Sequence, residues 1–440
     1  MQAMNSIAAI EQNAFAFNTS LSHYTHLLDL IGDKRFVLLG EASHGTHEFY
    51  AERALISQKL VTEKGFDAIA IEGDWPDAYR VHQYASQQGH DRNATEALSG
   101  FIRFPSWMWR NTVLMEFIEW LRDHNQSKLV DKRPVGFFGL DLYSLFTSID
   151  EVIRYLRRTD PIMAERAKAR YACFNQFDRD SQRYGYIVGL ADEGLSCEDQ
   201  VVSQLLDLNR LKPDTLNESF FSAAQNANVV KNAEHYYRSM FRRRVSSWNI
   251  RDQHMMQTLT QLDTHLSEKL KRPAKLIIWA HNSHLGDARA TEMAVRGELN
   301  LGQLVRTHYP NQSFLLGFST YCGMVTASSD WGGPVESKSV RPALKGSYEA
   351  LMHQSGLSQF ILPLNLDNEL VTLLSAERLQ RAIGVIYRPE TERQSHYLFA
   401  NLPRQFDALI HIDKTSALQP LDLSPYWRSG EAPETFPIGI

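Results

Sequence analysis

Six side chains that could carry out acid–base chemistry follow or end short apolar runs of the sequence. They are Glu41, His44, Glu72, Asp141, His281 and His284. In open α/β sheets, ligands bind outside the carboxyl ends of the strands, so these residues are expected at one edge of a sheet. Histidine can be neutral near pH 7 and accept a proton from water, and a carboxylate can orient its ring. Several carboxylates gathered at one edge need nearby cations or protons, so the pattern predicts a cluster with perturbed pKa values that is suited to acid–base chemistry.

Arg53 is a second indication of a charged site. It stands four residues after Phe49 and three before Ile56, on the expected buried stripe of a helix. A buried charge requires a partner, and Glu41 or Glu72 is the nearest plausible carboxylate. The residue is therefore either half of a structural ion pair or an arginine that orients the site or stabilises an oxyanion.

The elements that must position these residues are short strands separated by helices. Consecutive apolar positions without alternation are typical of strands buried on both faces of a mainly parallel sheet. The predicted strands cover residues 36–40, 68–72, 135–141, 276–281, 314–319, 382–387 and 408–412. Helical spacing predicts helices over residues 46–63, 76–87 and 111–124. We expect an α/β fold with a mainly parallel central sheet and flanking helices.

Residues 148–270 contain long helical patterns and no convincing strand. We interpret this block as a large helical insertion that acts as a cap over the sheet. The α/β catalytic core would then consist of residues 1–147 and 271–440.

Composition narrows the class of partner. The 440 residues include 46 Lys and Arg against 51 Asp and Glu, a net charge of −5, which argues against nucleic acid. No run of 18 apolar residues or basic leader is present, so we expect no membrane partner and a cytoplasmic location. The three cysteines are odd in number and lack CxxC spacing, which makes a disulfide framework or a zinc cage improbable and a reduced compartment the default.

Several segments together resemble the erythromycin esterase family. They are residues 40–50 (GEASHGTHEFY) with Arg53, then Glu72, residues 139–141 (GLD), residues 280–284 (AHNSH) and residues 318–321 (FSTY). The resemblance covers most of the chain. It implies that a water molecule hydrolyses a macrolactone ester, with no covalent acyl-enzyme, no required metal and no cofactor.

The resemblance also implies roles for individual residues. The essential histidine falls on His44, its supporting carboxylates on Glu41 and Glu72, and the arginine on Arg53. The paired histidines fall on His281 and His284. Residues 73–77 and 103–110 are instead similar to a broad branch of the family that includes proteins labelled for polysaccharide biosynthesis. The resemblance therefore supports the type of reaction more strongly than it supports a particular substrate.

Aromatic residues near the strand ends are candidates for substrate contacts. They are Trp75, Trp107, Trp109 and Tyr321. Such residues pack in a core or form the apolar wall of a ligand pocket. As a pocket wall, they would suit a small-molecule ester that is large and amphipathic.

Three other readings use the same residues. Ser43 lies between a strand and a helix, but a nucleophile elbow requires glycine where Glu41 stands. His44, His281 and His284 with a carboxylate would suit a divalent metal, whose bound water would be the nucleophile. A non-catalytic binding protein that retained the cleft would keep the same residues as well.

Overall fold

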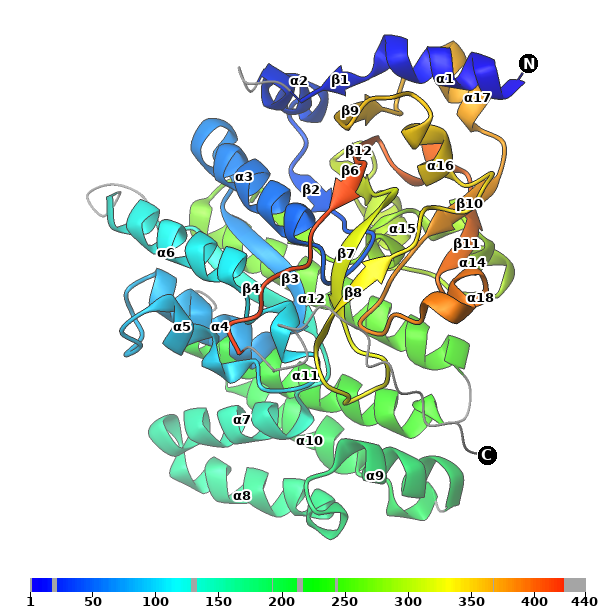
Figure 1. Cartoon of the computed structure of the whole chain (residues 1–440). Helices are drawn as coiled ribbons and strands as arrows, with labels where there is room; N and C mark the ends of the chain where they lie inside the picture. The colour runs from blue at the N-terminus through cyan, green and yellow to red at the C-terminus, as the bar shows by residue number, and fades with distance from the viewer. Residues whose placement is uncertain are drawn as a thin grey trace.

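The computed structural model describes residues 2–17, 22–127, 133–191, 193–211, 217–241, 244–366 and 368–422. Its centre is an eight-stranded sheet in the order β1-β9-β12-β6-β2-β5-β3-β4 (Figure 1). These strands are β1 (Phe15–Ala16), β2 (Phe36–Leu39), β3 (Ala68–Asp74), β4 (Gly136–Asp141), β5 (Leu276–Trp279), β6 (Ser313–Ser319), β9 (Gln359–Pro363) and β12 (Ala408–Ile412). The six strands from β12 to β4 pair in parallel, whereas β9 and β1 add antiparallel. The predicted α/β class with a mainly parallel sheet is confirmed.

Six of the seven predicted strands belong to this sheet, and residues 382–387 do not. That segment follows β10 (Arg378–Arg381) and makes only isolated bridges, from Ile383 to Ser43 and from Ile386 to Ser328. It is apolar because Ile383 packs in a small separate core beside the main sheet. The strand β9 was not predicted.

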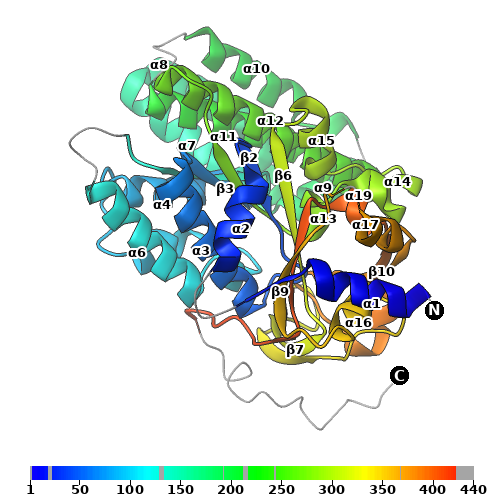
Figure 2. The same ribbon diagram turned by 90° about the horizontal axis from the view of Figure 1, so that it is seen from above.

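Helices cover both faces of the sheet, as Figure 2 shows. One face packs against α2 (Ser22–Ile31), α3 (His47–Lys64), α4 (Trp75–Ala85) and α6 (Thr112–Ser127). The other packs against α1 (Gln2–Asn13), α12 (Arg244–Leu270), α15 (Leu301–His308), α16 (Tyr348–His353) and α17 (Glu369–Leu374). Along β2 alternate side chains face opposite ways, with Val37 in the first core and Leu38 in the second. Both faces are therefore buried, which explains why the strands are apolar at consecutive positions.

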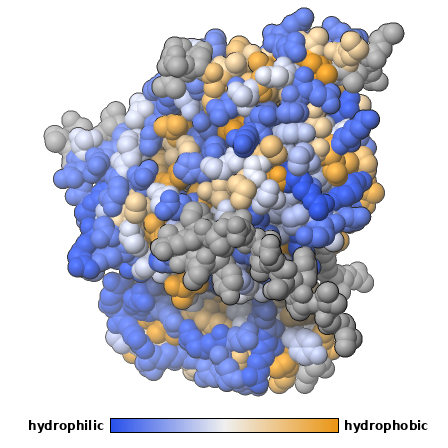
Figure 3. Space-filling model, viewed as in Figure 1, coloured by the Kyte–Doolittle hydropathy of each residue, from blue (hydrophilic) through white to orange (hydrophobic). Residues whose placement is uncertain are grey.

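The described residues between β4 and β5 form helices and no strand. The α-helices before α12 are α7 (Leu145–Thr159), α8 (Pro161–Tyr171), α9 (Ser181–Tyr186), α10 (Glu198–Arg210) and α11 (Glu218–Met240). They enclose an apolar core of their own. In Figure 3 the surface at the bottom of the molecule is mostly hydrophilic. No helix within the described ranges is long and apolar enough to cross a membrane.

One disulfide bond joins two of the three cysteines, which the sequence analysis did not predict. Cys173 and Cys197 are bonded, with their Cα atoms 5.9 Å apart. They are 24 residues apart in sequence, and only the packing of the helices between β4 and β5 brings them together. Cys322 is free.

Shorter elements complete the chain around the sheet. They are α5 (Ala94–Ala97), η1 (Leu98–Gly100), η2 (Ser106–Met108), α13 (Asn282–Leu285), α14 (Glu292–Val295), β7 (Cys322–Ala327), β8 (Glu336–Val340), α18 (Glu392–Ser395), β11 (Tyr397–Ala400), α19 (Leu402–Gln405) and β13 (Lys414–Thr415).

Candidate active site

A cavity of about 760 Å³ lies outside the carboxyl ends of β2, β3, β4 and β5. Its polar floor includes five of the predicted residues: His44, Glu72, Asp141, His281 and His284. The parallel register of the four strands aligns their ends, so residues far apart in sequence share one floor.

The end of β2 is shaped by close packing against the end of β5. A Cβ atom on Gly40 would come within 2.1 Å of Asn282 Oδ1. The Asn282 amide donates to the Phe318 carbonyl at 2.8 Å, and its backbone N–H donates to the Glu41 carbonyl at 2.8 Å. Glycine at position 40 therefore allows the close approach that fixes the loop from Glu41 to His44.

A hydrogen-bonded chain runs from His44 to Arg53. His44 Nδ1 lies 2.9 Å from Glu41 Oε1, and Arg53 Nη2 donates to Glu41 Oε2 at 2.6 Å. The Arg53 guanidinium is fully buried beside the rings of Tyr50 and Trp279, 4.3 and 5.0 Å from their centroids. Arg53 lies behind Glu41 and does not line the cavity. Its place suits the ion-pair reading and not direct contact with an oxyanion.

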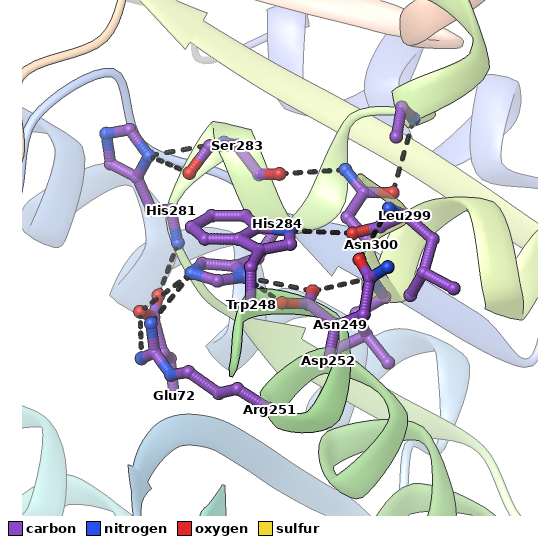
Figure 4. Close-up of polar contacts among 12 residues, drawn as sticks. Glu72, Trp248, Asn249, Arg251, Asp252, His281, Ser283, His284, Leu299 and Asn300 are labelled. Carbon is purple, nitrogen blue, oxygen red and sulfur yellow. Dashed lines mark hydrogen bonds and ion pairs between the residues drawn. The ribbon is translucent and has the colours of Figure 1, made fainter. Parts of the chain in front are cut away.

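A second network is centred on Arg251 of α12 (Figure 4). Its Nη2 donates to Glu72 Oε1 at 2.7 Å and to Asp141 Oδ2 at 2.6 Å. Its Nη1 lies 3.0 Å from His284 Nε2. His284 Nδ1 lies 2.9 Å from Asp252 Oδ2, and the ring stacks on Trp248 with centroids 4.4 Å apart. Helix α12 thus ties together the ends of β3, β4 and β5.

His281 occupies the N-cap position of α13. Its Nδ1 accepts from the Ser283 backbone N–H at 3.2 Å, while its own backbone N–H donates to Glu72 Oε2 at 2.8 Å. Its Nε2 is buried without a hydrogen-bond partner among the described residues, and its ring centroid is 4.8 Å from that of His44. Because Nδ1 is an acceptor, a neutral His281 carries its proton on Nε2.

The charges in the floor set the protonation of each group. Burial opposes the charge of Glu72, but His284, Arg251 and His44 outweigh it and hold the pKa of Glu72 well below its usual range. Burial likewise opposes the charge of His284, yet Asp252 and Glu72 raise its pKa above the ordinary value. Burial and the neighbouring His44 hold the pKa of His281 well below its usual value, so this ring is neutral.

Of the four aromatic residues predicted to contact substrate, one lines the cavity and three do not. Trp109 lines the cavity. Trp75 does not, because its side chain packs in the core on the other face of the sheet, and Nε1 donates to Ser222 Oγ at 3.2 Å. Trp107 is also buried in a core and does not line this cavity. Tyr321 stacks on His353 outside the cavity, with ring centroids 3.7 Å apart.

Sequence reasoning missed the contribution of α12. Trp248 of α12 lies one turn before the adjacent residues Arg251 and Asp252. A charged pair on the buried face of a long helix was the available signal. Phe104 and Trp331 also line the cavity, with ring centroids 5.0 Å apart.

The alternative chemistries are less well supported by these positions. Ser43 Oγ is hydrogen-bonded to Thr46 Oγ1, and Ser43 does not line the cavity. Within the part of the chain that is described, no group of three His, Cys, Asp or Glu side chains is arranged to hold a metal ion.

The chain is similar to a known protein family and to individual proteins of that family or of related name. A family model described as erythromycin esterase matches residues 61–415. A putative hydrolase, YbfO, of Bacillus subtilis (strain 168) is 23% identical over 360 residues, which span 77% of this chain and 76% of that protein. Erythromycin esterase type II of Escherichia coli is 22% identical over 414 residues, or 89% and 92% of the two chains.

Solved structures share the fold over almost the whole length. A succinoglycan biosynthesis protein superposes with a TM-score of 0.73 and 20% identity, over 95% of this chain and 98% of its own. A mutant of the erythromycin esterase EreC in its open conformation has a TM-score of 0.66 and 17% identity, over 91% and 95%. At these identities the likeness shows the fold alone.

Proposed function

Because the chain belongs to the erythromycin esterase family and is a hydrolase of the esterase type, we propose that it hydrolyses an ester with water activated by His44. The observation that carries this proposal is the chain from His44 through Glu41 to Arg53, with the imidazole at the cavity. Glu41 accepts the Nδ1–H of His44, which leaves Nε2 to take a proton from water. The buried Arg53 holds Glu41 in place through its ion pair.

The neighbouring groups complete the reaction. The water oxygen attacks the ester carbon while its proton passes to His44 Nε2. The neutral His281, through Nε2–H, donates to the oxyanion of the tetrahedral intermediate. The carbon–oxygen bond then breaks, and the His44 imidazolium returns the proton to the leaving alkoxide. Atoms balance without a covalent acyl-enzyme, and the products are a carboxylic acid and an alcohol.

We further propose that the substrate is large and amphipathic, of the macrolactone kind. The cavity of about 760 Å³ combines the polar floor with apolar walls that include Phe101, Phe104, Trp109 and Trp331. Pockets of this size and character take drug-sized molecules. The name of the Escherichia coli relative supports this choice.

A panel of aryl esters, simple lactones and macrolides tests the proposed substrate class. Macrolactone opening is expected, and tight binding with no turnover of any ester would instead indicate a binding protein.

Ser43→Ala is expected to keep kcat within about tenfold of the wild type, because Ser43 Oγ is hydrogen-bonded to Thr46 and lies off the cavity. Steady-state hydrolysis of the best ester from the panel measures this. Mass spectrometry of the enzyme during turnover should show no added acyl group. An acyl adduct on Ser43, or a loss as large as that of His44→Ala, would establish serine catalysis.

Chelation is expected to leave hydrolysis unchanged. The proposed steps use only side chains and water, and the Nδ1 atoms of His44 and His284 are engaged by carboxylates. The enzyme would be dialysed against EDTA and assayed, with metal content measured before and after. Loss of activity that Zn²⁺ restores would overturn the water-and-histidine mechanism in favour of a metal-bound nucleophile.

A further inference from the structure

The loop that carries His44 is hydrogen-bonded to segments that lie far along the chain. The Gly45 carbonyl accepts from the backbone N–H of Thr326 in β7 and from that of Leu418, each at 2.9 Å. The backbone N–H of His47 donates to the Ser416 carbonyl at 3.0 Å. Residues on the carboxyl side of His44 are therefore held by β7 and by the segment that contains Ser416 and Leu418.

This segment, residues 416–422, is called the strap here. It follows β13, and in Figure 1 it belongs to the red trace that runs down from β12. Leu418 is fully buried in the main core, and Thr326 Oγ1 donates to the Leu418 carbonyl. At the start of α6, the backbone N–H of Thr112 donates to the Gln419 carbonyl at 3.1 Å. The strap thus connects β7, the loop of His44 and α6.

Glu48 binds the strap from the first turn of α3. Its Oε2 accepts the Ser416 backbone N–H at 2.9 Å, and its Oε1 accepts the Ser416 hydroxyl at 2.7 Å. Glu48 belongs to the segment GEASHGTHEFY, yet the proposed hydrolysis gives it no role. It does not line the catalytic cavity, so an effect on the reaction would have to pass through the loop.

The backbone is held on both sides of His44. On the amino side, the Ala42 carbonyl accepts the Ile383 backbone N–H at 2.8 Å. On the carboxyl side, Gly45 lies directly against β7, since a Cβ atom there would come within 1.8 Å of the Thr326 carbonyl oxygen. The loop therefore cannot move toward β7, and the strap contacts it through the same Gly45 carbonyl.

We propose that the strap, through Leu418 and the Ser416–Glu48 contact, positions His44 for catalysis. This inference rests on the proposed function, because it assigns the strap a role in holding the imidazole at Glu41 and at the attacking water. A misplacement of about 1 Å can cost about 10²-fold in rate. Leu418, Ser416 and Glu48 do not line the cavity, so they are positioning residues that should affect kcat more than KM.

Leu418→Ala and Leu208→Ala form a matched pair of variants that tests the proposal. Both leucines are fully buried, but Leu208 lies in the separate core of the helices between β4 and β5. Both substitutions should lower the melting temperature. Well below both melting temperatures, Leu418→Ala should lose about tenfold or more in kcat with KM within about twofold. Leu208→Ala should keep both constants close to the wild-type values.

Glu48→Ala tests the same role without a change in a core. The contact between Glu48 and Ser416 is exposed, so this variant keeps the test valid if Leu418→Ala fails to fold. Its kcat should fall about threefold or more. Glu48→Gln keeps an oxygen that can accept from Ser416, so it should recover part of that loss.

Hydrogen exchange measured by mass spectrometry gives a readout that needs no turnover. In the wild type the His47 backbone N–H is protected by its bond to Ser416. A peptide that covers residues 44–48 should exchange faster in Leu418→Ala and Glu48→Ala, and at the wild-type rate in Leu208→Ala.

The outcomes that contradict the proposal are distinct. It is overturned if Leu418→Ala and Glu48→Ala keep the wild-type kcat or the wild-type exchange rate, or if Leu208→Ala shows the same losses. A wild type that hydrolyses no ester would instead remove the proposed function. If His44→Ala is inactive while both strap variants are fully active, only the role of the strap fails.

Discussion

His44→Ala is expected to lose at least ~10²-fold in kcat while the protein remains folded. The substitution removes the imidazole that lines the cavity and has its Nδ1 hydrogen-bonded to Glu41. Without it, no neutral base in the described floor is oriented by a carboxylate–arginine pair. The measurement is steady-state hydrolysis of the best ester, with the melting temperature and circular dichroism of each variant.

His47→Ala is the matched control for this prediction. His47 stands three residues further on, at the start of α3, and does not line the cavity. Its replacement should leave kcat close to the wild-type value. Turnover of His44→Ala at the wild-type rate would remove His44 from the mechanism. Glu41→Gln should fall between the two, since it keeps the size of the side chain but loses the charge that favours the imidazolium.

Arg251→Met is expected to reduce both stability and activity. Arg251 binds the carboxylates of Glu72 and Asp141 and contacts His284. Removing one partner of a buried ion pair typically costs about 3–5 kcal/mol of unfolding free energy, because the other charge is left unpaired. We expect a loss of this order in chemical denaturation. The kcat should fall by about tenfold or more, since Glu72 no longer holds the His281 backbone N–H in place.

The pH dependence of that loss follows from the carboxylates. In the wild type the pKa of Glu72 is held below its ordinary value, so its contribution to stability is present above the unfolded pKa and is lost as pH falls toward the folded one. In Arg251→Met the burial of Glu72 and Asp141 is no longer compensated, and their pKa values should rise. The variant is then expected to be less destabilised at pH 5 than at pH 8.

A double variant separates the structural from the catalytic role. Arg251→Met with Asp141→Leu removes both members of one pair, and replacing a buried pair by apolar side chains is often neutral. We expect it to recover part of the lost stability without recovering activity. Equal recovery of both would show that Arg251 acts only through folding, and no loss in Arg251→Met would contradict the network itself.

Much of the fold was predictable because strands that are buried on both faces of a sheet are apolar at consecutive positions in the sequence. The strands β2 and β5 are apolar at every position, and β3 is apolar from Ala68 to Ile71, since alternate side chains enter two different cores. The run at 382–387 has the same character and yet is no strand of the sheet, because a short apolar run does not state which core it enters.

The candidate site was predictable to a similar degree, through the rule that ligands bind at strand ends. His44, Glu72, Asp141, His281 and His284 each follow or end a predicted strand, and the structure brings them to one cavity. Trp75 also follows a predicted strand, yet its side chain packs in the core on the other face of the sheet and does not line the cavity. Position along the chain fixes where the backbone emerges, but not which way each side chain turns.

The sequence by itself determined the parallel sheet and the residues at its carboxyl edge, because hydrophobic periodicity and strand ends are local properties. Only the tertiary structure decided that Arg53 lies behind Glu41 and that Arg251 enters the floor from α12. Arg251 is 110 residues from Asp141 and 179 from Glu72 in sequence. Charge compensation in a buried site depends on which distant helix packs against it, and no local pattern encodes that choice.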